Sequence, residues 1–169
     1  MENFTRDAGV VGSGVGDVEF LLQTQAGKCT DISSVFVALS RIVVVPARGI
    51  FGMRISNEGD ITGAYHCRAE FYVPGYDWMP VDPSDVRKFM LNNDADLDNP
   101  DVIDIRDYYF GTQTETYIDF YSGRDLVLVP EQANGPLNYL MYPYVEVGNK
   151  ILDWFAQEDL KYTGTFEEL

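Results

Sequence analysis

The clearest periodic signal in the chain is a one-sided apolar stripe that begins near Cys29. Its members recur at the three- and four-residue spacing of one helix face. They are Ile32, Val35, Phe36, Leu39, Ile42 and Val43. Thr30 and Asp31 are residue types that start helices, and Pro46 lies just beyond the last apolar position. The pattern predicts an amphipathic helix whose first turn holds Cys29.

Three runs of strand-forming residues follow. They cover residues 47–55, 64–73 and 77–81, and Pro74-Gly75-Tyr76 separates the last two as the turn of an antiparallel hairpin. A three-residue turn sets position 68 opposite Asp82 and leaves His66 diagonal to Asp82 on the same face, whereas a two-residue turn would put His66 and Asp82 on opposite faces.

The second half of the chain contains further β-rich runs. They cover residues 116–121, 125–129, 139–147 and 150–155. Gly148-Asn149 is typical of a tight turn between the last two runs. The acidic segment 92–101, with Pro100 next to its end, predicts a surface loop.

Glycines dominate residues 1–16, which predicts a loop there. Asp17 is placed to cap a short helix through Gln25, with Phe20, Leu21 and Leu22 turned inward. There is no internal repeat and no sign of a second domain. We therefore expect a single domain over 1–169, with its core in 16–84 and a β-rich carboxy-terminal part in 107–155.

The charge balance excludes some function classes. A net charge of −15 and a pI near 4.2 disfavour nucleic acid as a partner, because nothing offsets phosphate repulsion. No run is long enough to span a bilayer, and Met1-Glu2-Asn3-Phe4 lacks the basic-then-apolar order of a signal peptide. These features predict no membrane partner and, by default, a cytoplasmic location, and they leave the oligomeric state open.

Cys29 is the candidate nucleophile. At a helix N-terminus, unpaired backbone N–H groups and the helix dipole favour the thiolate, which attacks carbonyl carbon. Taken alone, however, a cysteine beside an apolar run is more often a small core residue. A single Cys29–Cys67 bridge is also open, whereas a metal site would need a carboxylate because His66 is the chain's one histidine.

His66 and Asp82 complete a set of groups suited to thiol acyl transfer. Strand alternation puts His66 on the polar face of its strand and points it away from Cys67. A histidine accepts the thiol proton and later protonates the leaving amine, and a carboxylate fixes the histidine tautomer. The alternatives are a hydrogen-bonded core histidine and, for Asp82, a turn former ahead of Pro83.

Several motifs resemble the transglutaminase-like superfamily in its bacterial and archaeal branch. They are Gly27-Lys28-Cys29-Thr30-Asp31, Val45-Pro46-Ala47-Arg48, Tyr65 to Tyr72, and Gly75 to Ser84, with weaker likeness at Tyr109-Phe110-Gly111, Ser122 to Leu126 and Pro136 to Glu146. The resemblance implies a papain-like α+β fold in which the cysteine helix packs on an antiparallel sheet. It makes Cys29 the nucleophile, His66 the general base and Asp82 the orienting acid, and it implies neither cofactor nor metal.

The resemblance also predicts parts of the surrounding site. Arg68 stands where members commonly have an aromatic residue, so a more polar substrate groove is expected there, with Trp78 as a second groove residue. The backbone N–H of Cys29 and the side chain of Gln23 are the candidate oxyanion donors.

The predicted function is a cysteine protease or amidase that forms a Cys29 thioester on a peptide or protein substrate. The alternatives are a non-catalytic protein- or peptide-binding module on the same fold, a true transglutaminase that cross-links amines, and a metal site built from Cys29, His66 and Asp82.

Overall fold

The computed structural model describes residues 4–55, 59–112, 116–152 and 159–168. It combines α-helices with strands that pair antiparallel except for one short parallel pair near the amino terminus, as expected of an α+β protein. The chain divides into two compact units. Unit 1 comprises Met1–Gly49 and Cys67–Thr114, and unit 2 comprises Ile50–His66 and Glu115–Leu169. The division falls inside two strands, and each unit is described by itself.

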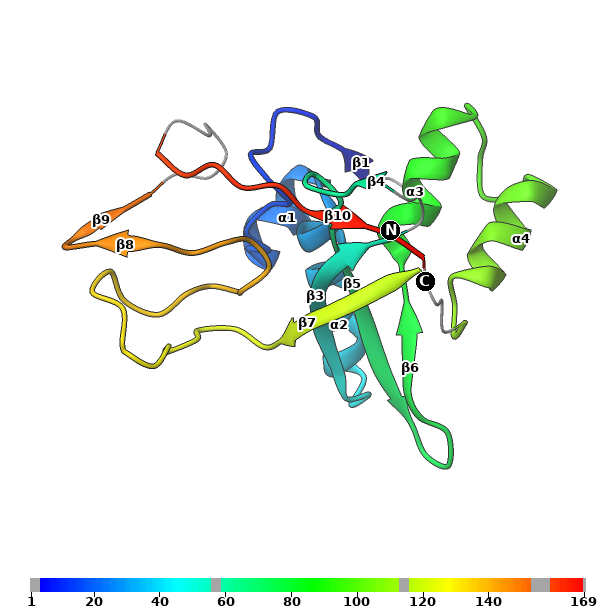
Figure 1. Cartoon of the computed structure of the whole chain (residues 1–169). Coiled ribbons are helices and arrows are strands. Elements are labelled where there is room, and N and C mark those ends of the chain that lie inside the picture. The colour runs from blue at the N-terminus through cyan, green and yellow to red at the C-terminus, as the bar shows by residue number, and fades with distance from the viewer. Residues whose placement is uncertain (1–3, 56–58, 113–115, 153–158, 169) are drawn as a thin grey trace. The chain divides into compact units, whose positions relative to one another are not determined.

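Unit 1 contains the helices (Figure 1). In chain order its elements are β1 (Thr5–Arg6), α1 (Val18–Thr24), β2 (Ala26–Gly27), α2 (Cys29–Ile42), the start of β3 (Ala47–Arg54), most of β5 (Tyr65–Val73), β6 (Asp77–Val81), α3 (Pro83–Asn92) and α4 (Pro100–Tyr108). None of the helices in the described residues is both long and apolar enough to cross a bilayer.

The β5–β6 hairpin has the predicted register. Val73 pairs with Asp77 and Ala69 with Val81, so the connection has three residues and position 68 falls opposite Asp82. On its other edge β5 meets β3, where the amide of Tyr72 donates to the carbonyl oxygen of Pro46 at 2.8 Å. The order of strands in unit 1 is therefore β6, β5, β3.

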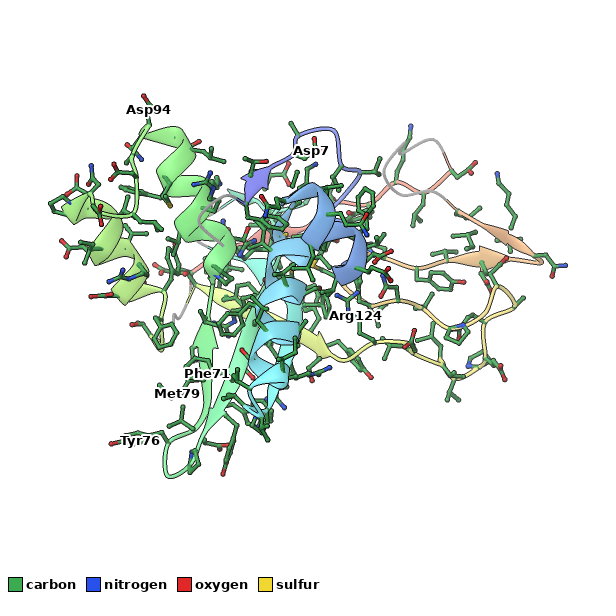
Figure 2. All side chains as sticks on the ribbon, turned by 180° about the vertical axis from the view of Figure 1, so that it is seen from behind. Asp7, Phe71, Tyr76, Met79, Asp94 and Arg124 are labelled. Atoms are coloured by element: carbon green, nitrogen blue, oxygen red, sulfur yellow. The ribbon has the colours of Figure 1, made fainter. Side chains whose placement is uncertain are left out.

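Helix α2 packs on one face of these strands, as the view from behind shows (Figure 2). The contact is a cluster of Val37, Ala47, Ala69 and Val81, with Phe36 and Phe71 packed against it. Ala69 and Phe71 are odd-numbered positions of β5, so the alternation in the sequence identifies the face that α2 covers. A second cluster joins α1 and α2 through Phe4, Leu21, Ile32 and Val35.

Two predictions of inward-facing residues are wrong in part. Leu21 of α1 is buried, but Phe20 and Leu22 are 58% and 54% exposed. Along α2 the stripe is buried at Ile32 and Val35, whereas Ile42 is 74% exposed. Periodicity shows which residues share a face but not how much of that face a neighbouring element covers.

Helices α3 and α4 were not anticipated from the apolar pattern. Each has an aspartate or asparagine as its N-cap and a proline at its first position. Asp82 accepts a hydrogen bond from the amide of Asp85 at 3.0 Å, and Asn99 accepts one from Asp101 at 2.9 Å. This pairing of cap and proline is a local start signal. The surface loop predicted at 92–101 is confirmed for residues 93–99, whereas its ends belong to α3 and α4.

Unit 2 contains the rest of β3 and pairs it antiparallel with β7 (Tyr117–Ser122), as predicted for residues 116–121. The register shifts between Phe51 and Gly52, where a Cβ on Gly52 would lie 2.0 Å from the carbonyl oxygen of Ile118. The other strands are β4 (Gly59–Asp60) with β10 (Thr165–Phe166), and β8 (Glu146–Val147) with β9 (Lys150–Ile151) around the predicted Gly148-Asn149 turn.

The strands predicted at 125–129 and over most of 139–147 are absent from the described structure. One isolated bridge joins Leu126 to Leu137 instead. Side chains supply the hydrogen bonds there: Gln132 binds the backbone of Leu126 and Leu128. The hydroxyl of Tyr144, together with Asn134 and the amide of Ala133, holds the pKa of Glu146 at about 2. Residues 153–155 of the last predicted run lie outside the described residues.

Candidate active site

Cys29 is the first residue of α2 and is 6% exposed. The first turn is anchored by Asp31, whose carboxylate accepts hydrogen bonds from the amides of Lys28 and Gly16, both at 2.9 Å. An acidic side chain that reaches back to the N-cap amide is half of a capping box. The amide of Thr30 also donates to the carbonyl oxygen of Ser13 at 2.9 Å. The helix start that carries the thiol is thus fixed from two sides.

Two glycines, Gly14 and Gly27, pack closely against the side chain of Asp31. A Cβ on Gly14 would lie 1.9 Å from Oδ2 of Asp31, and one on Gly27 would lie 2.5 Å from Cβ of Asp31. Glycine at both positions lets the backbone close around the carboxylate. The loop amides therefore bind a side chain of the same chain, and this role accounts for the glycines without an external phosphate.

Cys67 lies against the start of α2. Its sulfur is 3.2 Å from Oγ1 of Thr30, the residue that follows Cys29. Burial raises the pKa of Cys67 well above its ordinary value, and a hydrogen bond to Cys29 raises this pKa further. Both cysteines are free thiols. The face of β5 that carries Cys67 is therefore the face that meets α2.

Asp82 is held in the same part of unit 1. It is 6% exposed, its Oδ1 caps α3, and its amide donates to the carbonyl oxygen of Tyr109 at 3.1 Å. Its negative charge is one of the causes that raise the pKa of Cys67, although a smaller one than burial or Cys29. Unit 1 thus brings Cys29 and Asp82 together around Cys67. The turn former expected at Asp82 ahead of Pro83 is thus the N-cap of α3.

His66 is the last residue of the first segment of unit 2 and is 6% exposed. The hydroxyl of Tyr117 donates to the carbonyl oxygen of His66 at 2.5 Å. The Tyr117 ring also lies edge-on to the imidazole, with 6.0 Å between ring centroids. Tyr117 is therefore a positioning residue that the sequence did not reveal. The triad of Cys29, His66 and Asp82 remains a prediction.

We expect Tyr117→Phe to lower the free energy of unfolding by about 1 kcal/mol, because it removes one hydrogen bond to the main chain of His66 and keeps the ring. Urea unfolding followed by circular dichroism measures this change. Tyr121→Phe on the same strand is the matched control, because the Tyr121 hydroxyl has no hydrogen-bond partner in the described part of the chain. Equal stabilities of the two variants would contradict the positioning role.

The remaining predicted site residues occupy different settings. Gln23 is exposed on α1, and Arg68 is 4% exposed, which leaves little of it to form a groove surface. Trp78 lies under the guanidinium of Arg48, 4.1 Å from the ring centroid. Their roles in oxyanion and substrate binding remain predictions.

Arg48 links two of the sequence motifs. Its guanidinium pairs with Glu70 at 2.8 Å, and the Glu70 side chain is nearly buried. This ion pair links β3 to β5 beside Trp78. Arg48 and Glu70 therefore have a structural function.

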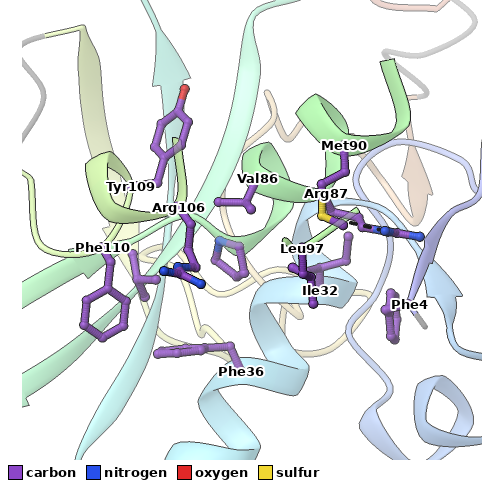
Figure 3. Close-up of a pocket in the computed structure, with 12 residues that line it drawn as sticks. Phe4, Ile32, Phe36, Val86, Arg87, Met90, Leu97, Arg106, Tyr109 and Phe110 are labelled. Carbon is purple, nitrogen blue, oxygen red and sulfur yellow. Dashed lines mark hydrogen bonds between the residues drawn. The ribbon is translucent and has the colours of Figure 1, made fainter. Parts of the chain in front are cut away.

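A separate cavity of about 250 Å³ lies among α2, α3 and α4 (Figure 3). Ile32 and Phe36 of α2 face Val86 and Met90 of α3 across it. Neither Cys29 nor Asp82 lines it, although Val81 and Pro83, the neighbours of Asp82, do. This apolar space is distinct from the candidate catalytic residues.

The amino-terminal half of the chain matches a known family. Residues 1–83 match the profile of the transglutaminase-like superfamily, and the matched range ends one residue after Asp82. Residues 1–83 therefore belong to the transglutaminase-like superfamily. The transglutaminase-like region therefore contains Cys29, His66 and Asp82, and the superfamily includes cysteine-dependent acyltransferases and proteases.

A curated relative extends the likeness to most of the chain. An uncharacterized protein of Haemophilus influenzae is 39% identical over 183 residues, which cover 96% of this chain and 50% of the relative. This chain thus spans about half the length of the curated relative. No solved structure matches.

Proposed function

We propose that this transglutaminase-like protein is a thiol-dependent acyl-transfer enzyme, a cysteine protease or amidase that cleaves a peptide, isopeptide or side-chain amide. The observation that carries the proposal is the position of Cys29 at the first residue of α2, with its turn fixed by Asp31 and with Asp82 in the same unit. A helix N-terminus favours the thiolate over the thiol. The cysteine helix also packs on antiparallel strands, which supports a papain-like arrangement.

In the proposed mechanism Sγ of Cys29 attacks the amide carbonyl carbon while His66 accepts the thiol proton. His66 then donates this proton to the leaving nitrogen, and the acyl group remains on Cys29 as a thioester. Water attacks the thioester with His66 as general base, and the carboxylic acid leaves. Asp82 holds the imidazole tautomer through the oxygen that does not cap α3. The Cys29 amide and Gln23 are the proposed oxyanion donors.

Alkylation by iodoacetamide tests this proposal. Between pH 7 and 8 we expect Cys29 to react more than about tenfold faster than Cys67, since only a thiolate reacts, and burial and the raised pKa keep Cys67 protonated. Peptide mapping by mass spectrometry measures both rates. The matched control is Cys67→Ala, which should take up one label at the wild-type rate of Cys29.

The same samples are assayed on a panel of peptides, isopeptides and glutamine side-chain amides, with and without a primary amine. We expect turnover to fall in proportion to the label on Cys29. A free acid as product indicates hydrolysis, and an amine conjugate would assign the chain to true transglutaminases. Full turnover with Cys29 blocked would contradict the proposal.

A further inference from the structure

The proposed mechanism leaves one buried nucleophile unused. Cys67 is fully buried, and its sulfur contacts Oγ1 of Thr30 at 3.2 Å. Since Thr30 follows Cys29 directly and Cys67 hydrogen-bonds to Cys29, the two thiols of the chain are neighbours. Contact between two thiols is the first requirement for a disulfide between them.

The fold explains why this neighbourhood exists. Helix α2 covers the odd-numbered face of β5 through Ala69 and Phe71, and Cys67 is the next odd-numbered residue toward the start of that strand. Cys29 is the first residue of the helix on that face. Both thiols therefore belong to unit 1 and are held by elements that pack directly on one another.

We propose that Cys67 is a resolving thiol, which captures Cys29 in a reversible disulfide after a hydroperoxide has oxidised Cys29. In the first step the Cys29 sulfur attacks one peroxide oxygen and the O–O bond breaks, which gives a sulfenic acid and water, or an alcohol from an organic peroxide. In the second step the Cys67 thiol passes its proton to the sulfenic oxygen as its sulfur attacks the Cys29 sulfur and the S–O bond breaks. The hydroxide leaves with the Cys67 proton as water, so both thiols are oxidised and one peroxide is reduced.

The environments of the two cysteines set the order of these steps. Cys67 is fully buried, whereas Cys29 keeps 6% exposure, so a small peroxide meets Cys29 first. The raised pKa of Cys67 keeps it a thiol and suppresses its own reaction with peroxide. The disulfide would block the nucleophile and protect it from irreversible oxidation to the sulfinic acid.

Mass spectrometry of the whole chain after treatment with one equivalent of hydrogen peroxide tests the inference. We expect the wild type to lose about 2 Da as the disulfide forms, and dithiothreitol to restore both thiols. Non-reducing peptide mapping should join the peptides that contain Cys29 and Cys67 within one chain. A gain of about 16 or 32 Da without the disulfide, or a disulfide between two chains, would overturn the inference.

Cys67→Ala and Cys67→Ser provide two variants in case one is poorly folded. Either should accumulate the Cys29 sulfenic or sulfinic acid, and dithiothreitol should fail to recover the sulfinic fraction. Behaviour equal to the wild type would overturn the resolving role. The inference rests on the proposed function only for the reactivity of Cys29. Because its test reads mass and not turnover, a catalytically inactive chain that still forms the disulfide would refute the proposed function alone.

Discussion

Replacement of Cys29 by alanine is expected to abolish amide turnover, with a fall in kcat/KM on the order of 10⁴-fold or more, as for other enzymes that lose a catalytic nucleophile. No other group is expected to substitute, because Cys67 is fully buried and held as a thiol. Steady-state kinetics on the best substrate of the amide panel measures the loss.

Two controls separate chemistry from folding in this experiment. Cys67→Ala removes the neighbouring thiol and should keep turnover within a small factor of the wild type. The circular dichroism spectrum and unfolding midpoint of Cys29→Ala should match those of the wild type, because the change removes one small side chain at the helix start. Retained turnover in folded Cys29→Ala would refute the role of Cys29.

The largest expected effect on stability comes from Gly14→Ala. Gly14 has φ of +91°, and its Cβ would fall 1.9 Å from Oδ2 of Asp31. The carboxylate cannot move aside without losing its hydrogen bonds from Gly16 and Lys28. We expect a loss of about 3 to 5 kcal/mol, the sum of the left-handed strain and one or two charge-assisted hydrogen bonds. Urea unfolding measures it.

Gly75→Ala measures the backbone strain alone, so the difference between it and Gly14→Ala gives the cost of the clash with Asp31. Gly75 has φ of +86° with open space around the added Cβ, so it carries the backbone strain alone, about 1 to 2 kcal/mol. Asp31→Ala combined with Gly14→Ala should cost less than the sum of the two single changes, since the clash disappears with the carboxylate. Equal effects of Gly14→Ala and Gly75→Ala, or strict additivity in the double variant, would contradict the anchoring role of Asp31.

Local rules account for what the sequence predicted correctly. The register of the β5–β6 hairpin follows from the turn length, and the start of α2 at Cys29 follows from the start signals and the apolar period. The capped short helix after Asp17 follows in the same way. These features depend only on residues close together in the chain, so one sequence is enough to predict them.

The features that the sequence did not predict depend on contacts between residues far apart in the chain. The exposure of Ile42 depends on which neighbour covers the helix end, and the Thr30–Cys67 contact depends on which face of β5 receives α2. The sequence leaves a Cys29–Cys67 bridge open without showing whether the two thiols meet, and the structure makes them neighbours. Residues 125–129 form a β-rich run, yet the Gln132 side chain takes up backbone hydrogen bonds there.

The central claim is that Cys29 forms a covalent acyl intermediate, and acid quenching followed by peptide mapping tests it most directly. The substrate should be an activated ester or anilide of an acyl group from the amide panel, so that hydrolysis of the thioester limits the rate and the intermediate accumulates. The account predicts an acyl mass on the peptide that contains Cys29, removable by hydroxylamine and absent in Cys29→Ala. Turnover with the acyl group on another residue, or an adduct that persists in Cys29→Ala, would contradict it.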